Sequence, residues 1–299
     1  MPEPGLIANL LLESAAGIAR SVGAKSIVVS ADALPEGCEP PEGSLLLTRR
    51  PEDKRRIQEL GIADNCVLEI PAVDLDRMGQ VKLAALIGVS RRLLDLSDTV
   101  VFLTGPFRGL IDSLVVLHLG SEYELLHATD QPTIDEHIKR TVFQRTLELA
   151  LHLGSYGREG RRIGAMLIVG DTAEVLDRSE QMILNPFQGY PEKKRNILDQ
   201  RMTETIREFA QLDGAILIRG NGVIESAGTR VLASSRHPVE SGLGSRHAAA
   251  AGITDSTKSI AITVSSSDGT VRIWRAGKLV ASLEPGGRGQ EGMEQVLGS

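Results

Sequence analysis

Hydrophobic positions in the first 130 residues alternate between helix-like and strand-like spacing. Over Leu6–Val22 and Gln80–Leu96 apolar residues recur at three- and four-residue steps, as on one face of an amphipathic helix. A further charged helix is expected over Glu52–Leu60. Short apolar runs of the buried-strand type are Ser26–Ser30, Ser44–Thr48, Cys66–Ile70 and Thr99–Thr104. This alternation favours an α/β unit whose mostly parallel strands have helices on both faces, a three-layer arrangement.

The remaining chain predicts a second α/β unit in which helices flank a mixed sheet. A helix over about Ile134–Leu153 leads to a central strand at Ile163–Val169, and Thr172–Gln181 is expected to be a helix capped by Asp171 or Thr172. Asn-Gly and Asp-Gly between apolar runs are strong signals for tight hairpin turns. They predict one hairpin at Asn221-Gly222 and another at Asp268-Gly269.

Turn-forming residues and composition divide the chain into three parts. Asp130-Gln131-Pro132 marks a boundary between a domain at 1–130 and a domain at 131–284. The segment 285–299 is rich in glycine and charge without apolar periodicity, which predicts a flexible tail.

Composition narrows the class of protein and its surroundings. With 41% hydrophobic and 24% charged residues the chain is typical of globular proteins. A net charge of −6 and 3% aromatic residues argue against a nucleic-acid surface. We find no uninterrupted apolar run of membrane-spanning length and no basic segment at Met1, so we expect a cytoplasmic protein without a membrane partner. Cys38 and Cys66 lack nearby Cys/His ligands, which predicts reduced structural thiols.

A glycine-containing loop that runs into a helix is the first candidate for chemistry. Its sequence is Gly242-Leu-Gly-Ser-Arg-His-Ala-Ala-Ala-Ala-Gly252, with Ser245 as the expected N-cap and Arg246 and His247 in the first turn. Free backbone N–H groups and the helix dipole would meet two possible cations there, which favours a phosphate ligand. The alternative is that the Arg-His pair is structural.

The second candidate is Asp213-Gly214-Ala215, where a helix gives way to a strand. The Asp213 carboxylate could project from the strand edge, and Gly214 would let a ligand approach the backbone. Asp-Gly is also ordinary turn chemistry between a helix and a strand, and spacing alone favours this second interpretation.

Together these motifs resemble the diadenylate cyclase domain. The resemblance rests on the order of Leu212-Asp-Gly-Ala-Ile216, the Asn-Gly hairpin, Gly244-Ser-Arg-His-Ala-Ala-Ala250 and Ile260-Ala-Ile-Thr-Val-Ser265. Upstream, Gly157-Arg-Glu-Gly-Arg-Arg-Ile-Gly164 and Ile183-Leu-Asn-Pro-Phe-Gln-Gly189 resemble the archaeal-type branch of the family. In that branch the N-terminal domain resembles the C-terminal α/β domain of pyruvate kinase, which fits residues 1–130.

The resemblance implies an enzyme that condenses two ATP molecules into cyclic di-AMP and releases two pyrophosphates. Asp213 would bind a divalent cation, Mn²⁺ or Mg²⁺, and help activate the attacking 3′-hydroxyl. The nucleotide-binding residues would be Gly214, Ala215, Gly244, Ser245, Arg246 and His247. Each ATP supplies a hydroxyl to the other, so a homodimer through facing cyclase domains, or a larger oligomer containing it, is implied.

Two departures from the family pattern keep another hypothesis open. The third position of the usual Arg-His-Arg motif is Ala248, and Ser265-Ser266-Ser267 stands where many relatives have a metal-binding glutamate. The chain could therefore be a sensor that binds ATP or cyclic di-AMP with little or no turnover. A third hypothesis makes the N-terminal domain the active part, as a small-molecule enzyme or a flavodoxin-like electron carrier. That domain lacks a phosphate-binding glycine signature, so we expect it to drive assembly or regulation instead.

Overall fold

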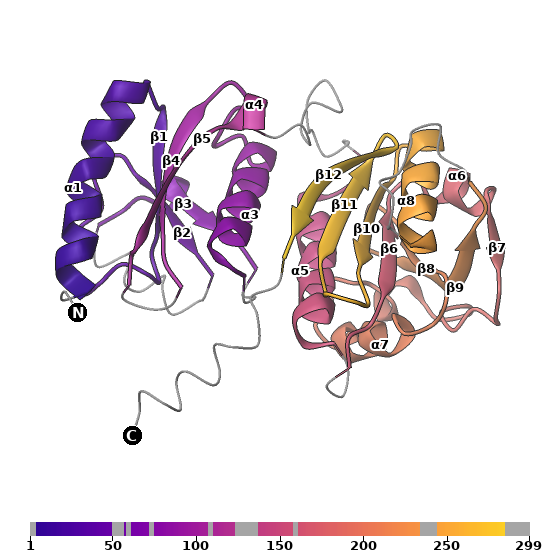
Figure 1. The fold of residues 1–299 in the computed structure, drawn as a ribbon. Helices are drawn as coiled ribbons and strands as arrows, with labels where there is room; N and C mark the ends of the chain where they lie inside the picture. The colour runs from indigo at the N-terminus through magenta and orange to yellow at the C-terminus, as the bar shows by residue number, and fades with distance from the viewer. Residues whose placement is uncertain are drawn as a thin grey trace. The chain divides into compact units, whose positions relative to one another are not determined.

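The computed structural model describes residues 4–49, 57, 61–71, 75–106, 110–122, 137–157, 161–233 and 244–284. The chain separates into two compact α/β units, one in each half of the sequence (Figure 1). The predicted boundary near residue 130, most of the predicted helix Glu52–Leu60 and the predicted tail 285–299 lie outside the described residues, so these three remain predictions.

The first unit is a five-stranded sheet with helices on both faces, which confirms the predicted fold class. Its strands are β1 (Ser26–Ser30), β2 (Leu45–Thr48), β3 (Val67–Glu69), β4 (Thr99–Thr104) and β5 (Ser113–His118). Its helices are α1 (Pro4–Val22), the 3₁₀ turn η1 (Asp64–Cys66), α3 (Arg77–Ser90) and α4 (Leu119–Glu122). The strand order is β3-β2-β1-β4-β5, and α1 and α3 lie on opposite faces (Figure 1).

Two details of the first unit differ from the sequence prediction. β5 was not predicted, and it pairs antiparallel with β4, whereas β1 pairs in parallel with both β2 and β4. Helix α3 begins at Arg77 because the Asp76 side chain accepts a hydrogen bond from the Gly79 amide at 2.6 Å, and it ends at Ser90. The apolar residues beyond Ser90 that extended the predicted helix belong to the turn before β4.

Helix α1 is the one helix of the described residues that is long and apolar enough to cross a membrane by length and composition. Its apolar character has a local explanation, because Ala8, Leu12, Ala15 and Ala19 are buried in the core of the first unit. These residues recur at three- and four-residue steps and form the stripe of a helix packed on a sheet.

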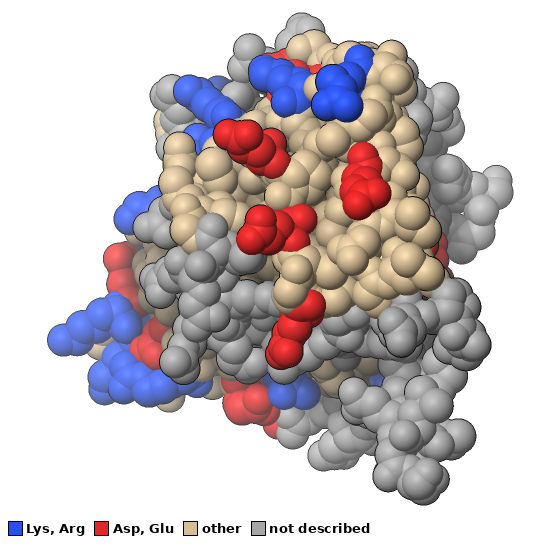
Figure 2. Space-filling model, turned by 90° about the vertical axis from the view of Figure 1, so that its left-hand side faces the viewer, with Lys and Arg blue, Asp and Glu red and all other residues tan. Residues whose placement is uncertain are grey.

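The face of the first unit that carries α1 has a mixed surface. Figure 2 shows acidic side chains spread singly over a surface that is mostly neither acidic nor basic. The described residues of this face do not form a basic stripe of the kind that binds nucleic-acid phosphates.

The second unit is built on a mixed seven-stranded sheet in the order β12-β11-β10-β6-β8-β9-β7. Its strands are β6 (Ala165–Val169), β7 (Ser179–Gln181), β8 (Ala215–Ile218), β9 (Ile224–Val231), β10 (Ile260–Val264), β11 (Val271–Arg275) and β12 (Lys278–Leu283). Its helices are α5 (Arg140–Tyr156), α6 (Thr172–Leu176), η2 (Glu192–Lys194), α7 (Met202–Phe209) and α8 (Ser245–Ser256). Both predicted hairpins are confirmed, since β8 pairs antiparallel with β9 and β10 with β11.

The prediction of a helix over Thr172–Gln181 was wrong in its second half. Helix α6 stops at Leu176, and Ser179–Gln181 forms an edge strand that pairs with β9. The Asp171 residue is the N-cap, but its carboxylate accepts from the Lys258 amide at 2.8 Å instead of capping the helix. Pairing with a distant strand decided this segment, and local periodicity cannot reveal such pairing.

Helix α8 lies against the central sheet through small side chains. Ala250 and Ala251 are buried with Ile253, and they share a core with Met166 and Trp274 of the sheet. Alanine at these positions allows the helix to approach the strands closely, and the start of α8 is thereby held beside the turn between β10 and β11.

Candidate active site

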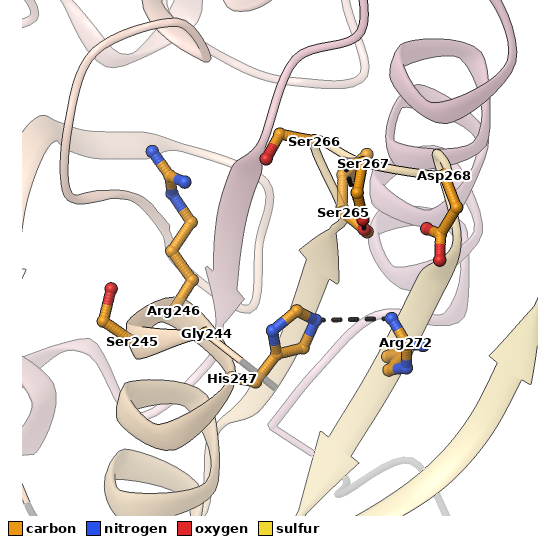
Figure 3. A pocket seen from close by; sticks show the side chains of 10 residues that line it. Gly244, Ser245, Arg246, His247, Ser265, Ser266, Ser267, Asp268 and Arg272 are labelled. Atoms are coloured by element: carbon orange, nitrogen blue, oxygen red, sulfur yellow. Dashed lines mark hydrogen bonds between the residues drawn. The ribbon is translucent and has the colours of Figure 1, made fainter. Parts of the chain in front are cut away.

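A cavity of about 350 Å³ lies between the start of α8 and the β10–β11 hairpin (Figure 3). Residues of both elements line it: Gly244, Ser245, Arg246, His247, Val264, Ser265, Ser266, Ser267, Asp268 and Arg272. Four of the seven predicted site residues, those from Gly244 to His247, therefore meet in one cavity. Two further charged side chains of the lining, at 268 and 272, were not predicted as site residues.

Gly244, and not Ser245, is the N-cap of helix α8, so this detail of the prediction was wrong. Gly244 has extended backbone angles (φ −72°, ψ 177°), whereas Ser245 is already helical and its side chain makes no capping hydrogen bond. The first hydrogen bonds of the helix run to the Gly244 carbonyl from the amides of His247 and Ala248. The amides of Ser245 and Arg246 thus lack an acceptor within the helix and are open to an anion.

Within the part of the chain that the structure describes, Arg246 and His247 each have a buried side-chain nitrogen without a hydrogen-bond partner. Among the described residues, Arg246 Nε and His247 Nδ1 are buried and have no hydrogen-bond partner. Unpaired buried donors are costly, about 1–3 kcal/mol each, and native proteins satisfy nearly all of them. Both lie beside the open amides of α8, which indicates that a ligand with acceptor oxygens belongs here.

The surroundings of His247 hold its ring neutral. Burial lowers the pKa of His247 below its ordinary value of 6.5, and the charges of Arg272 and Arg246 lower it further, while Asp268 acts in the opposite direction. The ring also packs near Trp274, with ring centroids 6.0 Å apart. A neutral imidazole has one donor and one acceptor nitrogen, so the hydrogen bonds of the ring decide which nitrogen faces a ligand.

Asp268 and the serine turn form the opposite wall of the cavity. Ser265 and Ser267 hydroxyls are 2.9 Å apart, and Asp268 Oδ1 accepts from the Thr270 amide at 2.9 Å. Partial burial raises the pKa of Asp268, but hydrogen bonds from Ser265 and Thr270 outweigh it and lower the pKa to about 2. The turn therefore has an ionised carboxylate one residue beyond the serine run.

Asp213 lies outside the cavity lining but close to it. Its Oδ1 accepts from the Gly214 amide at 3.0 Å and lies 3.6 Å from Arg246 Nη2. The side chain is 78% exposed, and no partner for Oδ2 is found among the described residues. The two candidate motifs, Asp213 and Arg246-His247, are thus brought together by the fold through this ion pair.

Gly214 and Ala215 have structural reasons for their identity that the sequence interpretation missed. Gly214 has φ +93°, and an added Cβ would lie 2.7–2.8 Å from the backbone of Thr229 in β9. The close approach at Gly214 is made by a neighbouring strand, whereas we had expected a ligand. Ala215 begins β8 and its side chain is buried in the core, so only its backbone could face a nucleotide.

Gly164 belongs to the site, although sequence reasoning gave it no role. An added Cβ there would lie 2.8 Å from Arg246 Nη1 and 3.2 Å from Ser266 Cβ. Gly164 therefore leaves space for the guanidinium of Arg246. The sequence around Gly164, in the segment before β6, has no feature that would predict this contact with Arg246.

Replacing Gly164 with alanine should displace the Arg246 guanidinium while the fold is retained, because the contact is with the flexible end of a side chain. With ATP, the ligand that the resemblance implies, as the probe, we expect affinity to fall about tenfold, since a charge-assisted hydrogen bond is weakened. Calorimetry of ATP binding and a thermal melt would measure both effects. Unchanged affinity would mean that Arg246 does not contact the ligand from this position.

The residues of the site fit a divalent cation held jointly with substrate. The described residues contain no group of three or more His, Cys, Asp or Glu side chains that could form a complete metal site. Mg²⁺ is commonly held by one or two carboxylates together with substrate phosphates and water. The exposed Asp213 carboxylate, with Oδ2 left open, beside donors suited to phosphate, matches that pattern.

Two protein-family models match the chain. Residues 153–279 match the DAC model, described as "DisA bacterial checkpoint controller nucleotide-binding". Residues 8–127 match the model described as "Probable sensor domain DacZ_P". The cavity and Asp213 fall within the first match, and the five-stranded sheet of the first unit falls within the second.

Two curated relatives share about a third of the aligned residues. The diadenylate cyclase of Methanocaldococcus jannaschii is 35% identical over 202 residues, which cover 65% of this chain and 62% of the relative. The diadenylate cyclase of Haloferax volcanii is 33% identical over 204 residues, which cover 66% of this chain and 72% of the relative. The match thus spans less than two thirds of the length of the Methanocaldococcus protein.

Solved structures are similar only over parts of the chain. A hypothetical membrane spanning protein from Bacillus cereus is 18% identical with a TM-score of 0.38, covering 50% of this chain and 66% of that one. A double mutant of DacA from Staphylococcus aureus is 21% identical with a TM-score of 0.32, covering 52% of this chain and 92% of that one. Scores this low add nothing to the argument from the site.

Proposed function

The chain belongs to the diadenylate cyclase family, and on that premise we propose that it condenses two ATP molecules into cyclic di-AMP and releases two pyrophosphates. The observation that carries the proposal is the pair of buried, unpaired side-chain nitrogens of Arg246 and His247 in the first turn of α8, where backbone amides are open. Three convergent kinds of donor in one cavity suit the triphosphate of a nucleotide.

In the proposed reaction the 3′-oxygen of one ATP bonds to the α-phosphorus of the other. The bond between the α-phosphorus and the bridging oxygen breaks, and pyrophosphate leaves with its electron pair. The hydroxyl loses its proton. The same reaction then occurs between the other 3′-hydroxyl and the other α-phosphorus, and it closes the ring with release of the second pyrophosphate. Arg246, His247 and the α8 amides would hold the triphosphate, and such positioning and charge neutralisation account for most of the catalysis in phosphoryl-type transfer.

Asp213 is the residue that we expect to activate the reacting 3′-hydroxyl. Its carboxylate is exposed next to Arg246 and has an oxygen to spare, so it can accept a hydrogen bond or a proton from the 3′-hydroxyl. Asp213 would also hold Mn²⁺ or Mg²⁺, which neutralises phosphate charge when bound.

The reaction needs two nucleotides to face each other, which one cavity cannot provide. We therefore propose that two copies of the chain face each other through their second units. Specific activity should then fall on dilution below the dimer dissociation constant. Sedimentation across the same concentration range would measure the assembly, and constant specific activity of a monomer would contradict a dimeric site.

The alternative of a sensor without turnover keeps some support from the site itself. Ala248 is exposed at the start of α8 and adds no cation, and the serine turn is closed by its own hydrogen bonds. A sensor would bind ATP or cyclic di-AMP as tightly as an enzyme but would convert neither.

The decisive experiment incubates the purified full chain with ATP and either Mn²⁺ or Mg²⁺. Chromatography and mass spectrometry would identify the products, and calorimetry would measure ATP binding in parallel. Metal-dependent formation of cyclic di-AMP and pyrophosphate is the expected result. ATP binding without product in either metal would replace the cyclase proposal with the sensor.

For the first unit we propose a role in regulation or assembly and not in chemistry. The proposal is supported by its own compact core and by its match to a family described as a probable sensor domain. A chain lacking residues 1–130 should differ from the full chain in oligomeric state or in activity. If it differs in neither, this role is wrong.

A further inference from the structure

We propose that Arg272 is a further phosphate-binding residue of the cavity and that it positions His247 as a hydrogen-bond donor to the ligand. The identity of the ligand as the triphosphate of ATP rests on the proposed function. Arg272 lies on β11, distant in sequence from both motifs, yet its side chain lines the same cavity as Arg246 and His247 (Figure 3).

The contact between Arg272 and His247 determines which ring nitrogen of His247 carries the proton. Arg272 Nη1 lies 3.5 Å from His247 Nε2. A guanidinium can only donate, so Nε2 must accept, and the proton of the neutral ring is then on Nδ1. Nδ1 is the buried nitrogen that has no partner among the described residues. Arg272 thus makes His247 a donor toward the unoccupied side of its ring.

The charges around His247 favour this arrangement. Arg272 faces the ring from β11, Arg246 from α8, and Asp268 from the β10–β11 turn, while Trp274 packs against it. The two arginines and burial together outweigh the single carboxylate, so the ring stays neutral near pH 7.

Arg272 is also a second cation of the cavity with donors to spare. Arg246 is engaged in part by Asp213 at 3.6 Å, and His247 carries no charge in its neutral form. Among the described residues, the Arg272 guanidinium makes one hydrogen bond, to His247, and no ion pair. A triphosphate brings several negative charges, and an arginine with free N–H groups is well suited to bind it.

The first test compares Arg272→Met and Arg272→Lys in the full chain by calorimetry with ATP. Methionine keeps an apolar stem but no donor, and we expect ATP affinity to fall about 10- to 100-fold, as for loss of a charged hydrogen bond. Lysine should lose less, because it keeps the charge. The matched control is Arg230→Met on β9, which removes an exposed ion pair with Glu180 at 3.8 Å and should change affinity less than about twofold.

The second test reads the positioning role directly. In protein labelled at histidine, nuclear magnetic resonance would follow the His247 ring through a pH titration, with a His247→Gln variant to assign its signal. The pKa of His247 should rise in Arg272→Met, because a neighbouring positive charge is lost. The control variant should leave the pKa of His247 unchanged. An unchanged pKa in folded Arg272→Met would show that the charge of Arg272 does not act on this ring, against the proposed contact.

The outcomes separate this inference from the proposed function. If the wild-type chain makes no cyclic di-AMP but Arg272→Met still weakens ATP binding and raises the His247 pKa, the cyclase proposal fails and the role of Arg272 stands. If the wild type is active and Arg272→Met binds ATP as tightly with the same His247 pKa, the inference about Arg272 is wrong. In an active enzyme we expect the Arg272→Met change mainly in KM, with kcat changed less.

Discussion

Replacing Asp213 with asparagine should reduce formation of cyclic di-AMP at least about a thousandfold. Asparagine keeps the shape of the side chain and an oxygen that can accept from the Gly214 amide, but it removes the charge that would hold a cation and receive a proton. General-base roles alone contribute about 10²–10⁴ to a rate. The fold should be unaffected, because the side chain is 78% exposed.

The measurement is product formation by the purified variant at saturating ATP and metal, with ATP affinity determined separately. Asp177→Asn is a suitable control, since Asp177 is an exposed carboxylate of the same unit outside the cavity. It should retain full activity. An Asp213→Asn enzyme that keeps more than about a tenth of the wild-type rate would show that this carboxylate is not required, against the role proposed above.

Replacing Gly214 with alanine should destabilise the second unit by about 3 kcal/mol and abolish most activity. The backbone has φ +93°, which an L side chain rarely adopts, and the new Cβ would lie 2.7–2.8 Å from backbone atoms of Thr229. Backbone strain and steric overlap each cost roughly 1–3 kcal/mol. Relief would require β8 and β9 to separate next to Asp213, which would move that carboxylate.

Gly189→Ala is the matched control for this stability effect. Gly189 has a similar φ of +84°, but an added Cβ meets nothing within 4 Å. It should therefore show the backbone strain without the overlap, about 1 kcal/mol. Thermal and denaturant melts of the wild type, Gly214→Ala and Gly189→Ala would measure the free energy of unfolding of each protein. Equal destabilisation by both substitutions would mean that β9 yields easily and that the packing of Gly214 does not hold the site.

The candidate site was partly predictable because some of its residues are neighbours in sequence. Arg246 and His247 lie in one helical turn after a glycine, so their convergence with free amides follows from local rules. The exact cap did not follow, because Gly244 and Ser245 are both acceptable N-cap residues. Asp213 was predicted as a strand-edge carboxylate, and its proximity to Arg246 needed the fold.

Other residues of the site have no local signal. Gly164 precedes β6, whereas Asp268 and Arg272 belong to the β10–β11 hairpin, and each acquires its role from what the sheet brings beside it. In the sequence, Ser265-Ser266-Ser267 stand where many relatives have a metal-binding glutamate. The structure shows the ionised Asp268 next to the serines in the same cavity, facing His247 and Arg272.

The same division holds for the whole fold. Hydrophobic periodicity and turn residues by themselves determined the α/β class, most strands and both hairpins, because these depend on interactions between residues close in sequence. Tertiary structure alone decided the antiparallel edge strand β5, the conversion of Ser179–Gln181 from predicted helix to strand β7, and the meeting of Arg272 with His247. Pairing and side-chain contact between distant segments fix these features, and such contacts leave no period in the sequence.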